Sequence, residues 1–164
     1  MQILAERSFL DQYLTLMFNI LLVEDWCTGE QYQVILGKCF YFEKTKKTFS
    51  SAKQNCLSMT KQGRSGKLAE PTTLQITTKL VEAAKNKFGN AYGVHIGVEK
   101  IDNNGNMKYT STGLKTPISP WKQSGANVDN GMDQPYVCLD PTHSGGSIWQ
   151  DCSKYYSYVS VCEF

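Results

Sequence analysis

Oxygen-bearing side chains gather in the C-terminal third of the chain. They are the amides and carboxylates Asn127, Asp129, Asn130, Asp133, Gln150 and Asp151. Hard cations such as calcium take about six to eight oxygen ligands from such groups. If the fold brings residues 127–133 beside residues 150–151, these oxygens can surround one cation. We therefore take Asn127, Asp129, Asp133, Gln150 and Asp151 as the candidate ligands of a calcium site. The alternative is a solvated turn at residues 127–133, with Gln150 and Asp151 capping nearby backbone groups.

Catalytic motifs are absent from the sequence. There is no Gly-x-Ser-x-Gly, no His-Glu-x-x-His and no phosphate-binding glycine loop. The two histidines are His95, inside an apolar stretch, and His143, among turn-forming residues. Neither is accompanied by an activated nucleophile. We expect a protein that is not an enzyme.

The chain has an even number of cysteines, none in a Cys-x-x-Cys pair: Cys27, Cys39, Cys56, Cys138, Cys152 and Cys162. This pattern in one small domain is typical of a disulfide framework formed in an oxidising compartment. The alternative is six reduced core cysteines in a cytosolic protein. The sequence alone leaves the pairing open.

Length and charge limit the classes of protein to which this chain can belong. A chain of 164 residues with 41% hydrophobic residues is suited to one globular core. The formal charge of +2 is too small to indicate nucleic acid or an anionic membrane as a partner. We interpret the basic cluster Lys44, Lys46 and Lys47 as a solvated turn before a helix rather than a ligand site.

Residues 1–26 differ from the rest of the chain. The apolar run over 13–23 has the length of a signal-peptide core and is too short for stable membrane insertion. Its flank has little positive charge, and no Ala-x-Ala site follows, so an extra N-terminal helix is the alternative. We expect a signal-like segment over 1–26, a domain over 27–164 and secretion of the mature protein.

Helix and strand signals alternate along the domain. Thr48 can cap a helix that starts at Phe49. The segment 71–73 opens a second helix, and Gly89 stops it. Residues 92–98 read as an apolar strand, and residues 102–105 as a turn. The stretch 111–134 has no periodicity, which indicates a long irregular loop over roughly residues 111–137.

Six segments, in order, resemble the C-type lectin-like domain in its long form. They are 27–42, 49–56, 66–69, 95–98, 149–152 and 161–163. His95-Ile96-Gly97-Val98 stands where the family has Trp-Ile-Gly-Leu, and Trp149-Gln150-Asp151 stands for Trp-Asn-Asp. The resemblance covers 27–164. It implies an α+β fold with two helices, antiparallel strands, a long irregular loop and three disulfides. The implied bridges are Cys27–Cys39, Cys56–Cys162 and Cys138–Cys152.

The same resemblance implies a calcium ion whose shell is completed by two sugar hydroxyls. The carbohydrate-binding residues would be Asn127, Asp129, Gln150 and Asp151. The site is degraded relative to the family. Whether residues 125–127 or 127–129 align with the family tripeptide, its cis proline is missing, and a non-proline cis bond costs about 2.5–4 kcal/mol. The resemblance of Asn127-Val128-Asp129 to the family's Gln-Pro-Asp tripeptide implies a preference for galactose-type over mannose-type sugars.

Two functions follow from these patterns. The leading hypothesis is a secreted carbohydrate-binding protein that recognises a glycan or glycoprotein with calcium, in innate immunity. The alternative is a lectin-like fold that binds a protein or mineral surface without calcium or sugar. The altered tripeptide favours the second hypothesis, and the surviving oxygen cluster favours the first.

Overall fold

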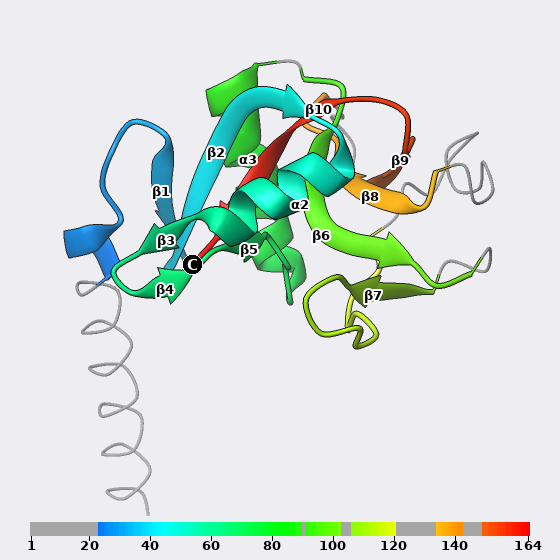
Figure 1. The fold of residues 1–164 in the computed structure, drawn as a ribbon, viewed down its shortest axis with the longest axis horizontal. Helices are drawn as coiled ribbons and strands as arrows, with labels where there is room; N and C mark the ends of the chain where they lie inside the picture. The colour runs from blue at the N-terminus through cyan, green and yellow to red at the C-terminus, as the bar shows by residue number, and fades with distance from the viewer. Residues whose placement is uncertain (1–22, 90, 103–105, 121–133, 143–148) are drawn as a thin grey trace, which may run out of the picture.

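The computed structural model describes residues 23–89, 91–102, 106–120, 134–142 and 149–164 (Figure 1). Its helices are α2 (Phe49–Ser58) and α3 (Leu74–Phe88). The strands are β1 (Tyr32–Ile35), β2 (Lys38–Lys47), β3 (Thr60–Lys61), β4 (Arg64–Ser65), β5 (Lys67–Leu68), β6 (Val94–Lys100), β7 (Met107–Tyr109), β8 (Tyr136–Leu139), β9 (Trp149–Cys152) and β10 (Tyr158–Glu163). The fold is α+β, as the sequence predicts.

One mixed sheet forms the centre of the domain. Its main strand order is β1-β2-β10-β6-β8-β9, while β5 pairs with β10 and β7 pairs with β6. The expectation of antiparallel strands is wrong for one pair, because β10 runs parallel to β6. β10 enters the sheet between strands that precede it by far in sequence, so its direction follows from long-range packing and not from a hairpin.

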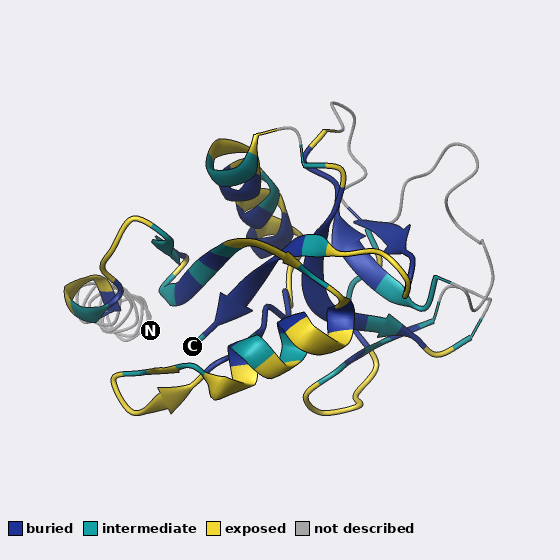
Figure 2. Cartoon of the chain, turned by 45° about the horizontal axis from the view of Figure 1, so that its top comes forward, coloured by how far each residue is buried: buried dark blue, intermediate teal, exposed yellow. Residues whose placement is uncertain are grey.

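The two helices cover opposite faces of this sheet (Figure 1). On one face, Leu80 and Ala84 of α3 belong to a core cluster with Phe42, Ile96 and Val161. On the other face, buried residues of α2 pack with the sheet in a second cluster: Phe49, Ala52, Cys56, Leu68 and Cys162. Adjacent residues of a strand point to opposite faces, which is why Val161 and Cys162 belong to different clusters. Figure 2 shows the resulting division of each helix into a buried and an exposed side.

Both helix starts match the sequence prediction. The Thr48 side chain accepts a hydrogen bond from Ser51 N, and the Thr73 side chain accepts one from Ile76 N. Each hydroxyl thereby satisfies a backbone N–H that the helix itself leaves unpaired. α3 ends at Gly89, whose φ of 66° suits a residue without a Cβ atom.

The three implied disulfides are confirmed. They are Cys27–Cys39, Cys56–Cys162 and Cys138–Cys152, with sequence separations of 12, 106 and 14 residues. The second bridge links α2 to β10 across the domain. The first bridge fastens the segment before β1 to β2, and the third joins the neighbouring strands β8 and β9.

The N-terminal segment is described only from Val23. Residues 23–26 are helical, and Val23 packs against the Cys27–Cys39 bridge. Among the described residues, no helix is long and apolar enough to cross a membrane. The expected signal-like run over 13–23 lies almost wholly outside the described residues.

The basic cluster near α2 belongs to a strand, so its interpretation as a turn is wrong. Lys44, Lys46 and Lys47 are the last residues of β2, which continues to the helix cap. Lys47 forms an ion pair with Glu43 at 2.9 Å, and Lys44 forms one with Glu30 at 3.1 Å. The strand is long because β10 pairs with it as far as Lys47, opposite Tyr158.

Candidate functional site

The predicted calcium ligands fall into two groups in the structure. Asn127, Asp129 and Asp133 lie outside the described residues. Gln150 and Asp151 lie on β9 and are 2% and 7% exposed. Both of these buried polar side chains contact other groups of the protein.

Asp151 contacts a buried cation of the protein itself. Its Oδ2 lies 3.5 Å from Nζ of Lys100, the last residue of β6, and both side chains are 2% exposed. Gln134 lies beside the same carboxylate; with its amide nitrogen turned toward Asp151, it donates at 3.1 and 3.0 Å to the two carboxylate oxygens. A buried carboxylate is stable in the ionised form only when such partners replace its water.

Lys100 is the site residue that the sequence interpretation missed, although the sequence carries a signal for it. Val94, Ile96 and Val98 alternate along β6 and belong to the main core cluster. Lys100 continues this alternation, so it points to the same face of the sheet. A lysine at an inward position requires a buried anion, and Asp151 supplies it.

Gln150 points to the other face of the sheet. Its side-chain nitrogen donates to the backbone carbonyl of Tyr92, just before β6. Its backbone is paired with Cys138 of β8. Gln150 and Asp151 are neighbours in sequence, but they serve different contacts, and in this arrangement they do not share one cation.

His95 lies in the same layer as Gln150. Its Nε2 is 3.2 Å from the carbonyl of Lys47, and its Nδ1 is 3.5 Å from Sγ of Cys138. Burial lowers the pKa of His95 to about 4, although the Lys47 carbonyl acts in the opposite direction. The imidazole is therefore neutral at physiological pH. His95 thus contacts both the Lys47 carbonyl and the Cys138–Cys152 bridge.

A cluster of potential metal ligands also occurs around His95. The ligand atoms of His95, Cys138 and Cys152 lie within 4.8 Å of one another. Both sulfur atoms form the Cys138–Cys152 bridge, so no thiolate is present to bind a metal. His143, the second histidine, lies outside the described residues.

Solved structures share this arrangement of strands, helices and loops. The C-type lectin CEL-I from Cucumaria echinata superposes with a TM-score of 0.67 at 18% identity, over 83% of this chain and 96% of that one. The fold is C-type lectin-like. The cow carbohydrate-recognition domain of CD23, crystallised in the presence of a GlcNAc2Man3 oligosaccharide, matches with a TM-score of 0.61 at 20% identity, over 85% and 96% of the two chains.

A third matching structure is that of a protein from a mineralised layer. Ovocleidin-17, a major protein of the Gallus gallus eggshell calcified layer, has a TM-score of 0.65 at 17% identity, over 83% of this chain and 97% of that one. No family model and no curated protein sequence matches this chain. C-type lectin-like domains are typically binding domains without enzymatic activity, and lectins and a mineral-associated protein both use this fold.

Gln150 and Asp151, the two described residues at the calcium position implied by the resemblance, do not fit a calcium ion. It offers one carboxylate, that of Asp151, which the Lys100 ammonium already neutralises. A divalent cation beside Asp151 would also lie beside this ammonium and be repelled by it. The amide nitrogen of Gln150 is bound to Tyr92 on the opposite face. A calcium ion there would depend on residues 127–133 and on displacement of Lys100.

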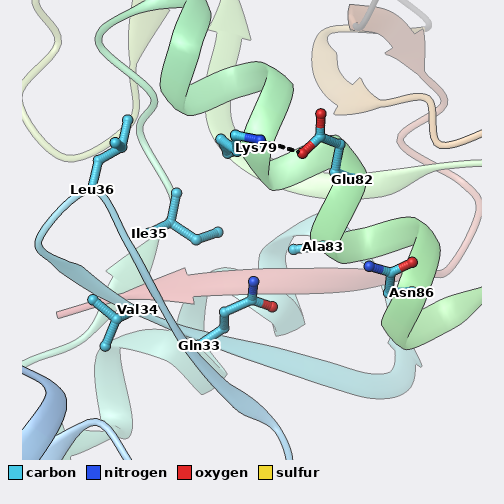
Figure 3. Close-up of a pocket in the computed structure, with 8 residues that line it drawn as sticks. All are labelled: Gln33, Val34, Ile35, Leu36, Lys79, Glu82, Ala83 and Asn86. Carbon is cyan, nitrogen blue, oxygen red and sulfur yellow. Dashed lines mark hydrogen bonds and ion pairs between the residues drawn. The ribbon is translucent and has the colours of Figure 1, made fainter.

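The cavity between β1 and α3 does not provide a better site. It has a volume of about 280 Å³ and is lined by Gln33, Val34, Ile35, Leu36, Lys79, Glu82, Ala83 and Asn86. In Figure 3, the charged groups of Lys79 and Glu82 pair with each other at the rim, at 2.8 Å. These charges cancel, and no histidine, cysteine or hydroxyl side chain lines the cavity.

Proposed function

We propose that this chain is an extracellular, non-catalytic recognition protein that binds a glycan without calcium. The observation that carries the proposal is the buried Lys100–Asp151 ion pair. The Lys100 ammonium balances the negative charge of Asp151, as a calcium ion would do. The carboxylate thus needs no metal to be stable in the folded protein.

Two further observations support a glycan as the ligand. The fold is that of CEL-I and of the CD23 domain, whose structure was determined in the presence of an oligosaccharide. The three disulfides support an extracellular location. Within this proposal, residues 1–26 are a removed secretion signal, residues 27–164 are the mature domain, and the glycans belong to microbes met in innate defence.

A glycan array with the secreted protein tests the proposal, once in calcium and once in a chelator. We expect the same glycans to bind in both conditions. Calorimetric titration of calcium into the protein should give no binding heat. N-terminal sequencing of the secreted product should start near residue 27.

The variants Asn127→Ala and Asp129→Asn test the opposite case, in which glycan binding depends on calcium. Binding that is lost in chelator, restored by calcium and abolished by these variants would overturn calcium independence and support the calcium site at residues 127–133. If no glycan binds in either condition, the proposal fails. The remaining function is then a protein or mineral surface ligand, in the manner suggested by the eggshell protein ovocleidin-17.

A further inference from the structure

A second, larger groove lies away from the Lys100–Asp151 pair. Two adjoining cavities of about 520 and 450 Å³ share Lys46, Ala91 and Val159 in their walls. We call the combined surface the Lys46 groove. It is bounded by the end of β2, the C-terminal end of α3 and the start of β10, which lie together in Figure 1.

One wall of the Lys46 groove is basic. It consists of Lys44 and Lys46 from β2 and Lys87 from α3. None of the residues that line the two cavities is acidic. Lys46 is exposed and has neither a hydrogen bond nor an ion pair with a described residue, so its charge is available to a ligand. Lys44 pairs at the surface with Glu30, and Lys87 donates to the Glu30 backbone carbonyl.

Another part of the lining is aromatic. Tyr92 and Tyr156 are each 66% exposed, and Tyr158, which is half-buried, belongs to the same lining. Tyrosine presents an apolar ring face and a polar hydroxyl, a combination that is enriched in binding sites. Lys46 and these tyrosines thus line one cavity, and Lys44 and Lys87 line the cavity that adjoins it.

Contacts with buried residues hold the aromatic part of the lining in place. The Gln150 amide binds the Tyr92 carbonyl, which fixes the backbone that carries the Tyr92 ring. The Tyr158 ring packs edge-to-face on His95, with 5.1 Å between ring centroids. Gly93 leaves room for it, because a Cβ there would lie 3.1 Å from Tyr158 Cδ1. The Tyr158 ring and the Tyr92 backbone are therefore held in place before a ligand arrives, which lowers the entropy lost on binding.

The chemistry of the basic and aromatic parts of the lining selects a ligand. Tyrosine ring faces pack against the C–H faces of pyranose rings, while lysine ammonium groups pair with anionic substituents. A neutral sugar would leave the basic wall unused. We propose that the Lys46 groove binds a sulfated saccharide chain, an assignment that rests on the proposed glycan-binding function and gives it a ligand class.

The test uses the secreted full chain and a heparin-derived hexasaccharide, titrated by calorimetry. We expect binding that weakens as salt is raised. Lys46→Gln should reduce the affinity on the order of fivefold, because one charge-assisted contact is lost. Tyr92→Ala should reduce it by about three- to tenfold. Lys79→Gln is the matched control. It also removes one positive charge, but from a residue of α3 outside the Lys46 groove, so it should leave the affinity unchanged.

Three further arms decide the ligand class. A desulfated hexasaccharide of the same backbone should not bind measurably. Vesicles with anionic phospholipid should not bind either, and preferential binding to them would overturn the assignment to saccharide. Equal losses for Lys46→Gln and Lys79→Gln would show diffuse attraction rather than a groove, and would also overturn it. If the glycan array finds neutral glycans while the hexasaccharide fails to bind, the groove assignment is wrong and the general glycan-binding proposal stands.

Discussion

The Lys100 ammonium and the Asp151 carboxylate form an ion pair at 3.5 Å beneath the sheet surface, with 2% of each side chain exposed. The pair links the end of β6 to β9. These two strands do not pair with each other, because β8 lies between them. The contact therefore joins the strands through side chains on the core face.

Removal of one member of this pair should be more harmful than removal of both. Asp151→Asn or Lys100→Met alone leaves a buried charge unpaired and should lower the free energy of unfolding by about 3–5 kcal/mol. The double variant should lose clearly less than the sum of the two. Urea unfolding of the four proteins in a double-mutant cycle measures the coupling.

The exposed pair Lys79–Glu82 is the control for this cycle. Its atoms are closer, at 2.8 Å, but the side chains are 53% and 55% exposed. The same substitutions there should change the unfolding free energy by about 0.5 kcal/mol or less. Similar losses at both pairs would contradict the role of burial.

His95 should make stability depend on pH between neutrality and about pH 4. Its folded-state pKa is lowered to about 4 from the ordinary 6.5, because burial disfavours the charged imidazolium. The unfolded state therefore binds the proton first as pH falls, and stability decreases below about pH 6.5. Between about pH 7.5 and pH 5 this histidine should account for a loss of about 2 kcal/mol.

His95→Phe provides the comparison for that pH dependence. Phenylalanine keeps an aromatic ring against Phe49 and Tyr158 but cannot be protonated. Guanidinium unfolding at both pH values should show a smaller difference for the variant than for the wild type. An unchanged difference would assign the pH dependence to other groups.

The Cys56–Cys162 bridge should contribute more stability than the bridges with short separations. It closes a separation of 106 residues, against 14 for Cys138–Cys152. In the chain-entropy model this corresponds to about 4–5 kcal/mol against about 3 kcal/mol. Paired Cys→Ala variants, compared by thermal and urea unfolding, test the order. A larger loss on removal of Cys138–Cys152 would contradict the entropic explanation.

Gly97 should not tolerate a side chain. A Cβ at this position would lie 2.8 Å from the Leu68 carbonyl oxygen and 2.8 Å from Glu70 Cγ. Gly97→Ala should therefore destabilise the domain by about 1–3 kcal/mol through overpacking between β6 and the segment after β5. Calorimetric unfolding measures this, and an unchanged melting temperature would show that the segment after β5 can move away.

Local signals in the sequence predicted the helices well. The Thr48 cap, the opening of a helix at residues 71–73 and the Gly89 stop depend on side-chain and backbone preferences within a few residues. The disulfide pairing came from the resemblance to the C-type lectin-like domain, since the cysteines alone left it open. The structure confirms both.

Long-range relationships were beyond the reach of the sequence interpretation. The parallel pairing of β10 with β6 is set by packing between segments far apart in the chain. The partner of Asp151 was missed because Lys100 is about fifty positions away in sequence and was not recognised as inward-facing. Gln150 was predicted to bind the same cation as Asp151. Strand alternation instead places the two side chains on opposite faces of the sheet.

The central position of β10 has a consequence for biosynthesis. This strand pairs with β2, β5 and β6, yet every other strand of the described domain precedes it in the sequence. While a ribosome is still making residues 158–163, the facing edges of β2 and β6 have no partner, and Cys56 has no Cys162 to oxidise with. The sheet therefore closes only after translation has passed Glu163, and until then the unpaired edges of β2 and β6 are open to association with other chains.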